Sequence, residues 1–157
     1  MKIFMANEDL EFMQIALNLA RKAELNNEVP VGAVIVKNGK VISKGMNACI
    51  LNNDPTAHAE IKAIRSAAKK IKNYRLNDCS IYVTLEPCAM CIGAIQHARI
   101  KKIIYGAADP KTGACGSVIN LLDIKKINHH TKAFGGVLEK KCGQILKDFF
   151  LSKRKKP

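Results

Sequence analysis

The chain of 157 residues is 48% hydrophobic and 25% charged, a balance typical of folded globular proteins that excludes a disordered chain. No apolar run approaches the roughly 18 residues that cross a bilayer, and the N-terminal residues lack the features of a secretory signal. We therefore expect a cytoplasmic protein, without a membrane partner, that folds as one domain over residues 1–157. The net charge is +13, of which residues 101–157 carry +9, and such an excess attracts polyanions such as nucleic acid. A general abundance of lysine is the alternative explanation.

The first part of the chain predicts a helix followed by a hairpin. Apolar residues at helical spacing predict a helix from Asn7, as its cap, to about Leu25. Two β-branched runs at 31–36 and 41–42 flank Asn38-Gly39, a dipeptide typical of tight β-hairpins.

The central part of the chain predicts two helices that alternate with two strands. Asp54 followed by Pro55 predicts the capped start of a helix that ends near Lys70. Residues 80–85 predict a buried strand, Pro87 opens a second capped helix, and residues 102–105 predict the next strand. Strands that alternate with helices indicate an α/β layered domain whose sheet is at least partly parallel.

The last part of the chain predicts a loop at 106–116, a short helix at 118–122 and a final amphipathic helix from Glu139 to about Leu151. The apolar face of the final helix consists of Cys142, Ile145, Leu146 and Phe149. Its other face and the residues that follow are rich in lysine. We therefore expect a basic C-terminal helix and tail over residues 139–157.

Two predicted helix starts carry residues that bind metals. Cys88 and Cys91 lie on one helix face near an N-terminus, where the helix dipole favours the thiolate. His58 offers a third ligand, and three protein ligands plus a water are the arrangement of a catalytic zinc. A fourth ligand, from Cys115 or His97, would instead give a closed structural site, and two core cysteines are the remaining alternative.

Glu60 follows His58 by two residues. A carboxylate beside a metal-bound water is placed to take its proton and pass it on, which favours a catalytic site. The alternative is that Glu60 only stabilises the N-terminus of its helix electrostatically.

These motifs together resemble the bacterial tRNA-specific adenosine deaminases, a branch of the zinc-dependent cytidine and deoxycytidylate deaminase superfamily. The superfamily carries H-x-E followed by P-C-x-x-C. The resemblance covers nearly the whole chain in order, through EVPVGAV at 28–34, DPTAHAE at 54–60, YVTLEPC at 82–88, DPKTG at 109–113, NYRL at 73–76 and DFF at 148–150.

The resemblance implies a three-layer α/β domain of the cytidine-deaminase type, with a central mixed five-stranded sheet and helices on both faces. It implies one Zn²⁺ per subunit and proton transfer by Glu60. The implied zinc ligands are His58, Cys88 and Cys91. The implied substrate-binding residues are Asn47, Val29, Ala59 through its backbone, Asp109, Lys111 and Phe149. Ala108 stands where this family often has arginine, so one backbone contact is not carried over.

The resemblance further implies hydrolytic deamination of adenosine to inosine at the wobble position of a tRNA. The expected partners are the anticodon stem-loop of the arginine tRNA with A at that position and a second copy of the chain, which would pack through an apolar helix at 89–98. A deaminase of a free base or nucleotide, such as guanine, cytosine or deoxycytidylate, is the first alternative. A non-catalytic, zinc-stabilised RNA-binding module is the second. The basic C-terminal part favours tRNA, and Glu60 favours an enzyme.

Overall fold

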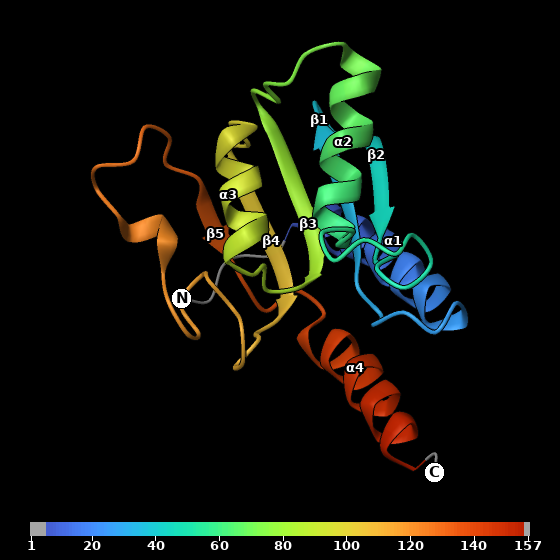
Figure 1. Cartoon of the computed structure of the whole chain (residues 1–157). Coiled ribbons are helices and arrows are strands. Elements are labelled where there is room, and N and C mark those ends of the chain that lie inside the picture. Colours follow the sequence, from blue (N-terminus) through green and yellow to red (C-terminus); the bar gives the residue numbers. More distant parts are fainter. Residues whose placement is uncertain (1–5, 156–157) are drawn as a thin grey trace.

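The computed structural model describes residues 6–155, so that Lys156 of the expected basic tail lies outside the described residues. Five strands form one sheet in the order β2-β1-β3-β4-β5 (Figure 1). The strands are β1 (Gly32–Lys37), β2 (Lys40–Met46), β3 (Cys79–Leu85), β4 (Lys102–Ala107) and β5 (Lys132–Phe134). β1 pairs antiparallel with β2 and β3, whereas β4 pairs parallel with β3 and β5, which confirms the expected mixed sheet.

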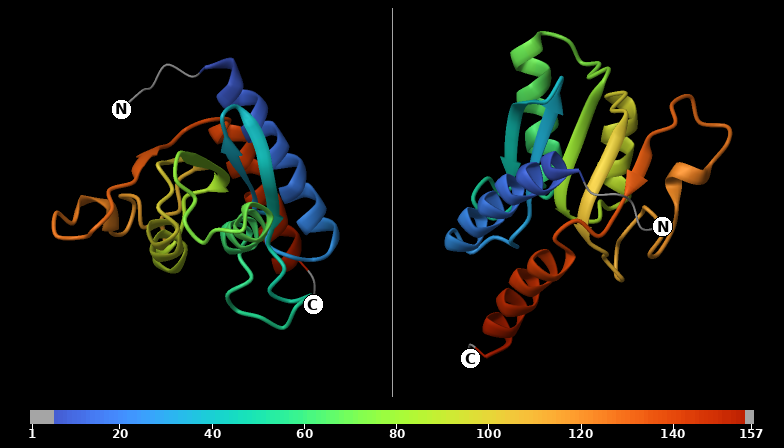
Figure 2. Two further views of the ribbon diagram at one scale, coloured as in Figure 1. Left: turned by 90° about the horizontal axis from the view of Figure 1, so that it is seen from above. Right: turned by 180° about the vertical axis from the view of Figure 1, so that it is seen from behind.

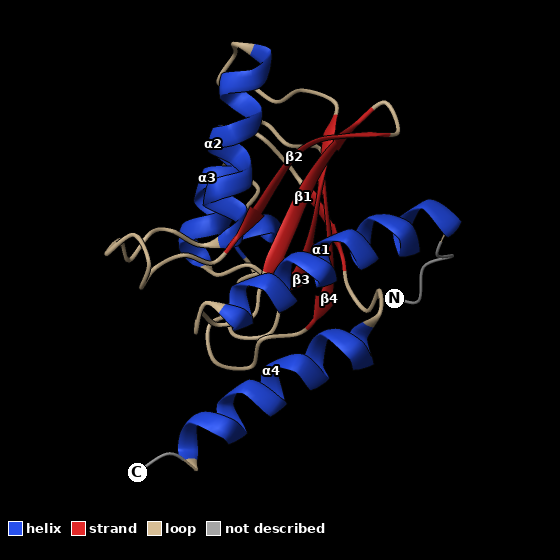
Figure 3. Ribbon diagram, turned by 90° about the vertical axis from the view of Figure 1, so that its right-hand side faces the viewer, coloured by secondary structure: helices blue, strands red, loops and turns tan. Residues whose placement is uncertain are grey.

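Helices cover both faces of this sheet (Figure 2), which confirms the three-layer α/β architecture. The helices are α1 (Asn7–Leu25), α2 (Ala59–Ile71), α3 (Ala89–His97) and α4 (Glu139–Arg154), with a 3₁₀ turn η1 (Leu121–Asp123). α2 and α3 lie on one face, α1 lies on the other, and α4 lies on the α1 side and extends past the end of the sheet (Figure 3).

The alternation of side chains along the strands divides the core between the two faces. Ile81 and Val83 of β3 pack into the cluster that includes α2 and α3. Tyr82, between them, packs with Phe12 of α1 and Ile104 of β4 in the second cluster. Since successive residues of a strand point to opposite faces, the continuous apolar run of β3 fits a strand that is buried on both sides.

The hairpin that joins β1 and β2 turns at the predicted dipeptide. Asn38 and Gly39 both have positive φ values, 51° and 74°, as the common two-residue hairpin turn requires. The hairpin therefore forms where the sequence indicates.

Two predicted helix caps are wrong, and one strand of the structure is not predicted by the periodicity. Ala6, not Asn7, precedes the first turn of α1. Asp54 does not cap α2, because its carboxylate accepts hydrogen bonds from the Thr56 backbone and hydroxyl and forms a local turn, and α2 begins only after His58. The periodicity also missed β5, which has three residues and no apolar alternation.

Helix α4 packs on the sheet through the predicted apolar face. Cys142, Leu146 and Phe149 are buried, and Ile145 is half-buried. Gly106 of β4 permits this approach, since a Cβ atom at that position would lie 2.7 Å from the Thr84 carbonyl oxygen and 2.8 Å from the Cys142 Cβ. None of the helices between residues 6 and 155 combines the length and the apolar character that a membrane crossing requires.

Candidate active site

The residues of the expected zinc site meet at one edge of the sheet. β2, β3 and β4 end at this edge and β1 begins there, because Gly32 pairs with Met46 and Leu85 pairs with Ala107. α2 and α3 start directly above it. His58 is the residue before the first turn of α2, and Cys88 is the equivalent residue of α3. Two residues 30 positions apart are thereby placed side by side.

His58, Cys88 and Cys91 form one cluster of possible metal ligands, whose ligand atoms all lie within 4.8 Å of one another. His58 Nδ1 lies 3.7 Å from Cys88 Sγ and 3.6 Å from Cys91 Sγ. In a tetrahedral site with Zn–S of about 2.3 Å and Zn–N of about 2.0–2.1 Å, the nitrogen and sulfur ligands are roughly 3.6 Å apart. The three side chains therefore have the spacing and chemistry that a zinc ion requires.

Of the three groups, only Cys88 is shifted towards its metal-binding form, since a metal binds deprotonated cysteine and neutral histidine. The hydrogen bond from the Cys91 thiol lowers the pKa of Cys88 to about 4, so Cys88 is a thiolate at neutral pH, the form that binds metal. The same hydrogen bond raises the pKa of Cys91, and burial raises it further. The hydrogen bond to Cys88 raises the pKa of His58.

No fourth ligand joins this cluster among residues 6–155. Cys115 lies in the loop after β4, and burial raises its pKa to about 12. His97 lies at the opposite end of α3. The structure thus favours three protein ligands with one free coordination position. It disfavours the closed structural site with a fourth protein ligand, which the sequence alone did not exclude.

A pocket of about 210 Å³ opens beside the cluster, and Glu60 lies in its wall. Glu60 is only 4% exposed, and burial raises its pKa because a carboxylate loses hydration there. A raised pKa brings a carboxyl group closer to the pH at which it can both accept and return a proton. Val29, Asn47, His58, Cys88, Asp109 and Thr112 also line this pocket.

Asn47 and Ala59 are linked to each other. The side-chain oxygen of Asn47 accepts a 2.8 Å hydrogen bond from the Ala59 backbone N–H at the start of α2. This bond uses the N–H group of Ala59, which is fully buried and is not among the lining residues. Asn47 thus has a capping role for α2 in addition to its place in the pocket wall.

Asp109, Lys111 and Phe149 lie at different distances from the pocket. Asp109 lines it, and its carboxylate accepts hydrogen bonds from the Lys111 and Thr112 backbone N–H groups, which fixes the turn. Lys111 is exposed and lies outside the pocket wall. Phe149 is 6% exposed in the packed face of α4, whereas its neighbour Phe150 is 47% exposed. The structure therefore brings Asp109 to the zinc cluster and leaves Phe149 in the core.

Sequence reasoning missed two buried carboxylates in the loops around the pocket. Glu28 accepts hydrogen bonds from the backbone N–H groups of Ile50 and Leu51. Glu86 accepts hydrogen bonds from the loop that follows β4. The sequence offers no pattern for these attachments beyond the glutamates that precede Val29 and Pro87, because all donors except the Ser117 hydroxyl are backbone groups more than 20 residues away.

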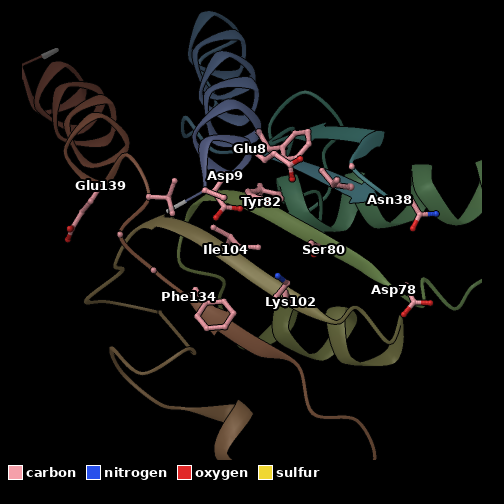
Figure 4. Close-up of a pocket in the computed structure, with 17 residues that line it drawn as sticks. Glu8, Asp9, Asn38, Asp78, Ser80, Tyr82, Lys102, Ile104, Phe134 and Glu139 are labelled. Carbon is pink, nitrogen blue, oxygen red and sulfur yellow. Dashed lines mark hydrogen bonds between the residues drawn. The ribbon is translucent and has the colours of Figure 1, made fainter. Parts of the chain in front are cut away.

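A larger cavity, of about 900 Å³, lies on the face of the sheet that α1 covers (Figure 4). Acidic side chains at its rim include Glu8, Asp9, Asp78 and Glu139, and Tyr82 donates a hydrogen bond to Asp9 within it. None of the expected site residues lines it. The smaller pocket at the zinc cluster is therefore the candidate active site.

Three possible zinc ligands at the starts of two helices, with a buried glutamate in the same pocket of an α/β domain, define the class of zinc-dependent nucleobase deaminases. The model of the MafB19-like deaminase family matches residues 7–154. A tRNA-specific adenosine deaminase of Haemophilus influenzae is 51% identical over 147 residues, which are 93% of this chain and 85% of that protein. The chain therefore belongs to the MafB19-like deaminase family and groups with the tRNA-specific adenosine deaminases.

Two solved structures refine the comparison. One, described as a study of A-to-I editing by tRNA:A34 deaminases at the wobble position, matches with a TM-score of 0.84 and 43% identity over 87% of this chain and 99% of that chain. The other, a guanine deaminase from Bacillus subtilis, matches with a TM-score of 0.60 and 46% identity over 66% of each chain. The first match extends over more of the fold.

Proposed function

We propose that this chain is a zinc-dependent hydrolase that converts adenosine to inosine at the wobble position of a tRNA. The observation that carries the chemistry is the cluster of His58, Cys88 and Cys91 at tetrahedral spacing, with Glu60 in the same pocket. The choice of tRNA rests on the relatives, which are named tRNA-specific adenosine deaminases at 41–51% identity.

His58, Cys88 and Cys91 would hold one zinc ion per subunit. A zinc ion in such a site lowers the pKa of a bound water towards 7 and so supplies a nucleophile at neutral pH. Glu60 accepts the proton of the attacking water and delivers it to N1 of adenine. Once the water oxygen has bonded to C6, Glu60 takes the remaining hydroxyl proton and passes it to the amino group, so that the C6–N6 bond breaks, ammonia leaves and C6 becomes the carbonyl of inosine.

Asn47 and Val29 would hold the base. Since the side-chain oxygen of Asn47 accepts from Ala59, its NH₂ group is the part that can donate to an acceptor on the base. Val29 is half-buried and offers an apolar surface on the same wall. The target base must leave its stack to reach this pocket, which costs least in a single-stranded loop such as the anticodon loop.

The RNA backbone would be held by the basic residues of the C-terminal part. Lys140, Lys141, Lys147, Lys153, Arg154 and Lys155 are all exposed on α4 and directly after it. Asp109, with Lys111 beside it, would contact the nucleotide next to the target. We propose the arginine tRNA with A at the wobble position as the substrate and the cytoplasm as the place of action, with residues 1–157 acting as one domain.

We further propose that the chain forms a homodimer. The outer face of α3 carries small residues, Ala89 and Gly93, beside Met90, which is 37% exposed. Small residues permit close approach of the same helix from a second copy.

Deamination of a free base is the second candidate, and the match to the guanine deaminase structure favours guanine as its substrate. Product analysis distinguishes the two. The purified protein is incubated with a tRNA that has A at the wobble position and, in parallel, with guanine, cytosine and free adenosine, and nucleosides are identified by mass spectrometry. We expect inosine from the tRNA. Turnover of a free base without any action on tRNA would refute the proposal.

A further inference from the structure

Glu86 is a buried carboxylate that the proposed chemistry does not use. It is 2% exposed and directly precedes Pro87 and the metal-cluster residue Cys88. Burying an ionised carboxylate is costly unless hydrogen bonds replace its hydration. The hydrogen bonds that stabilise it therefore indicate what this residue does.

All four donors to Glu86 come from the loop that follows β4. Oε1 accepts from the Asp109 N–H at 3.2 Å and from the Ser117 hydroxyl. Oε2 accepts from the Cys115 N–H at 2.9 Å and from the Ser117 N–H at 3.2 Å. Residues 109–117 thus wrap around one carboxylate with their backbone N–H groups directed inward.

The same loop is packed too closely on Glu86 to tolerate a side chain at Gly113. A Cβ atom there would clash with the Glu86 carboxylate. The backbone completes the attachment, since Ala114 N–H donates to the Pro87 carbonyl at 2.9 Å and Gly113 pairs with Cys88. The loop is therefore joined to the segment that starts α3 and carries the zinc-cluster cysteines.

We propose that Glu86 is a positioning residue that fixes the 109–117 loop, and with it Asp109, relative to the zinc cluster, and thereby sets the affinity for the nucleotide beside the target. This inference rests on the proposed function, because it assigns the loop a contact with RNA. Glu86 also lines the pocket, but all four hydrogen bonds to its carboxylate come from the loop, so the proposed role is to position this loop. Glu28 makes a similar attachment to the backbone of residues 50–51.

The substitution Glu86→Gln tests this role with almost no change in volume. The new NH₂ group cannot accept a hydrogen bond, so it must replace either Oε1 or Oε2. At the Oε2 position it would face two N–H donors. At the Oε1 position it can donate to the Ser117 hydroxyl oxygen, and only the Asp109 N–H loses its acceptor. The variant is therefore expected to release the Asp109 end of the loop and to keep the Cys115 end.

Amide hydrogen exchange followed by NMR reads out this difference residue by residue in the full-length, zinc-loaded protein. In the Glu86→Gln variant, the Asp109 amide should exchange faster, whereas the amides of Cys115 and Ile50 should keep their wild-type rates. Glu11→Gln, an exposed carboxylate on α1, provides the matched control and should leave all three rates unchanged. Equal Asp109 exchange in the wild type and the variant would overturn the proposal.

Kinetics on an anticodon stem-loop RNA then test the consequence for the reaction. Glu86→Gln should raise KM by roughly tenfold, the effect of one lost hydrogen bond to a charged group, while kcat and zinc content stay near wild type. A loss of kcat or zinc at unchanged KM would contradict a positioning role. An inactive wild type would instead contradict the proposed function, and the exchange rates would still decide the role of Glu86.

Discussion

Two regions place their functional side chains in opposite environments. One is the end of the sheet where His58, Cys88 and Cys91 meet, called the cluster edge below, and the other is helix α4. At the cluster edge, His58 and Cys88 are half-buried and Glu60 is buried, and all three stand at helix starts fixed by packed strands. On α4, the buried residues serve packing and the basic residues are exposed. Chemistry requires the first environment, since burial shifts pKa values and fixes geometry, whereas attraction of a polyanion requires only exposed charge. The roles proposed for these two regions therefore predict that turnover and RNA affinity can be changed separately.

Loss of the cluster should have the largest effect. We expect Cys91→Ser to lose both zinc and deamination, and chelation of the wild type to abolish activity that added zinc restores. Cys115→Ser is the matched control and should keep one zinc per chain, because Cys115 lies outside the cluster. Elemental analysis and turnover of tRNA measure both. A Cys115→Ser protein without zinc would show that the shell has a fourth protein ligand.

Glu60→Gln should slow deamination without weakening the binding of zinc or tRNA. We expect kcat to fall by roughly 10²–10⁴-fold, the usual contribution of a general acid–base group, with zinc content and tRNA affinity unchanged. The control is Glu11→Gln. If the variant deaminates tRNA at the wild-type rate, Glu60 only stabilises the start of α2, and the proton must move through another group.

Gly106→Ala should disturb α4 without touching the cluster. The added methyl group meets the Thr84 carbonyl and Cys142, so α4 must shift, at a cost of about 1–3 kcal/mol in the free energy of unfolding. Zinc content should stay the same, and tRNA affinity should fall with the displaced basic residues. Gly143→Ala on α4 is the matched control, since a Cβ there lies 3.9 Å from its nearest neighbour, Ala107. Chemical denaturation and RNA binding of both variants test this, and equal stability would contradict the packing argument.

Neutralising the basic tail should have the smallest effect on the enzyme. Replacing Lys153, Arg154, Lys155 and Lys156 with Gln is expected to weaken tRNA binding and flatten its salt dependence, by roughly 0.7–0.9 in log–log slope for each lost phosphate contact. Lys153 also contacts Asn27 and the Phe149 ring, so Arg154 and Lys155 should contribute more. Turnover at saturating tRNA should be nearly unchanged. An unaltered salt slope would mean that the tail only aids solubility.

The two regions also differ in how far the sequence predicts them. At the cluster edge, the short spacings from His58 to Glu60 and from Cys88 to Cys91 predict the candidate ligands and the candidate proton carrier. The structure brings these residues together. The elements that place them follow from local patterns such as Asn38-Gly39. The attachments of the pocket loops are not predicted by such patterns, because three of the four donors to Glu86 are backbone groups 23 to 31 residues away, which any sequence could supply.

Helix α4 shows the limit of periodicity. Its apolar face is predicted correctly, but the pattern does not tell what that face contacts, and the structure places Phe149 in the core, outside the pocket wall. β5 escaped prediction for a related reason. Three residues, Lys132–Phe134, are too few for alternation to appear. They form a strand because they pair in parallel with β4.

Sequencing of the treated tRNA tests the central claim, deamination of the wobble adenosine, most directly. Inosine pairs with cytosine, so reverse transcription reports each deaminated adenosine as guanosine at its own position. We expect full conversion of the wobble adenosine by the zinc-loaded protein, no conversion of other adenosines in the tRNA, and far less conversion by the Glu60→Gln variant in the same time. Conversion at other positions, or an unchanged tRNA under conditions in which guanine is consumed, would contradict the account.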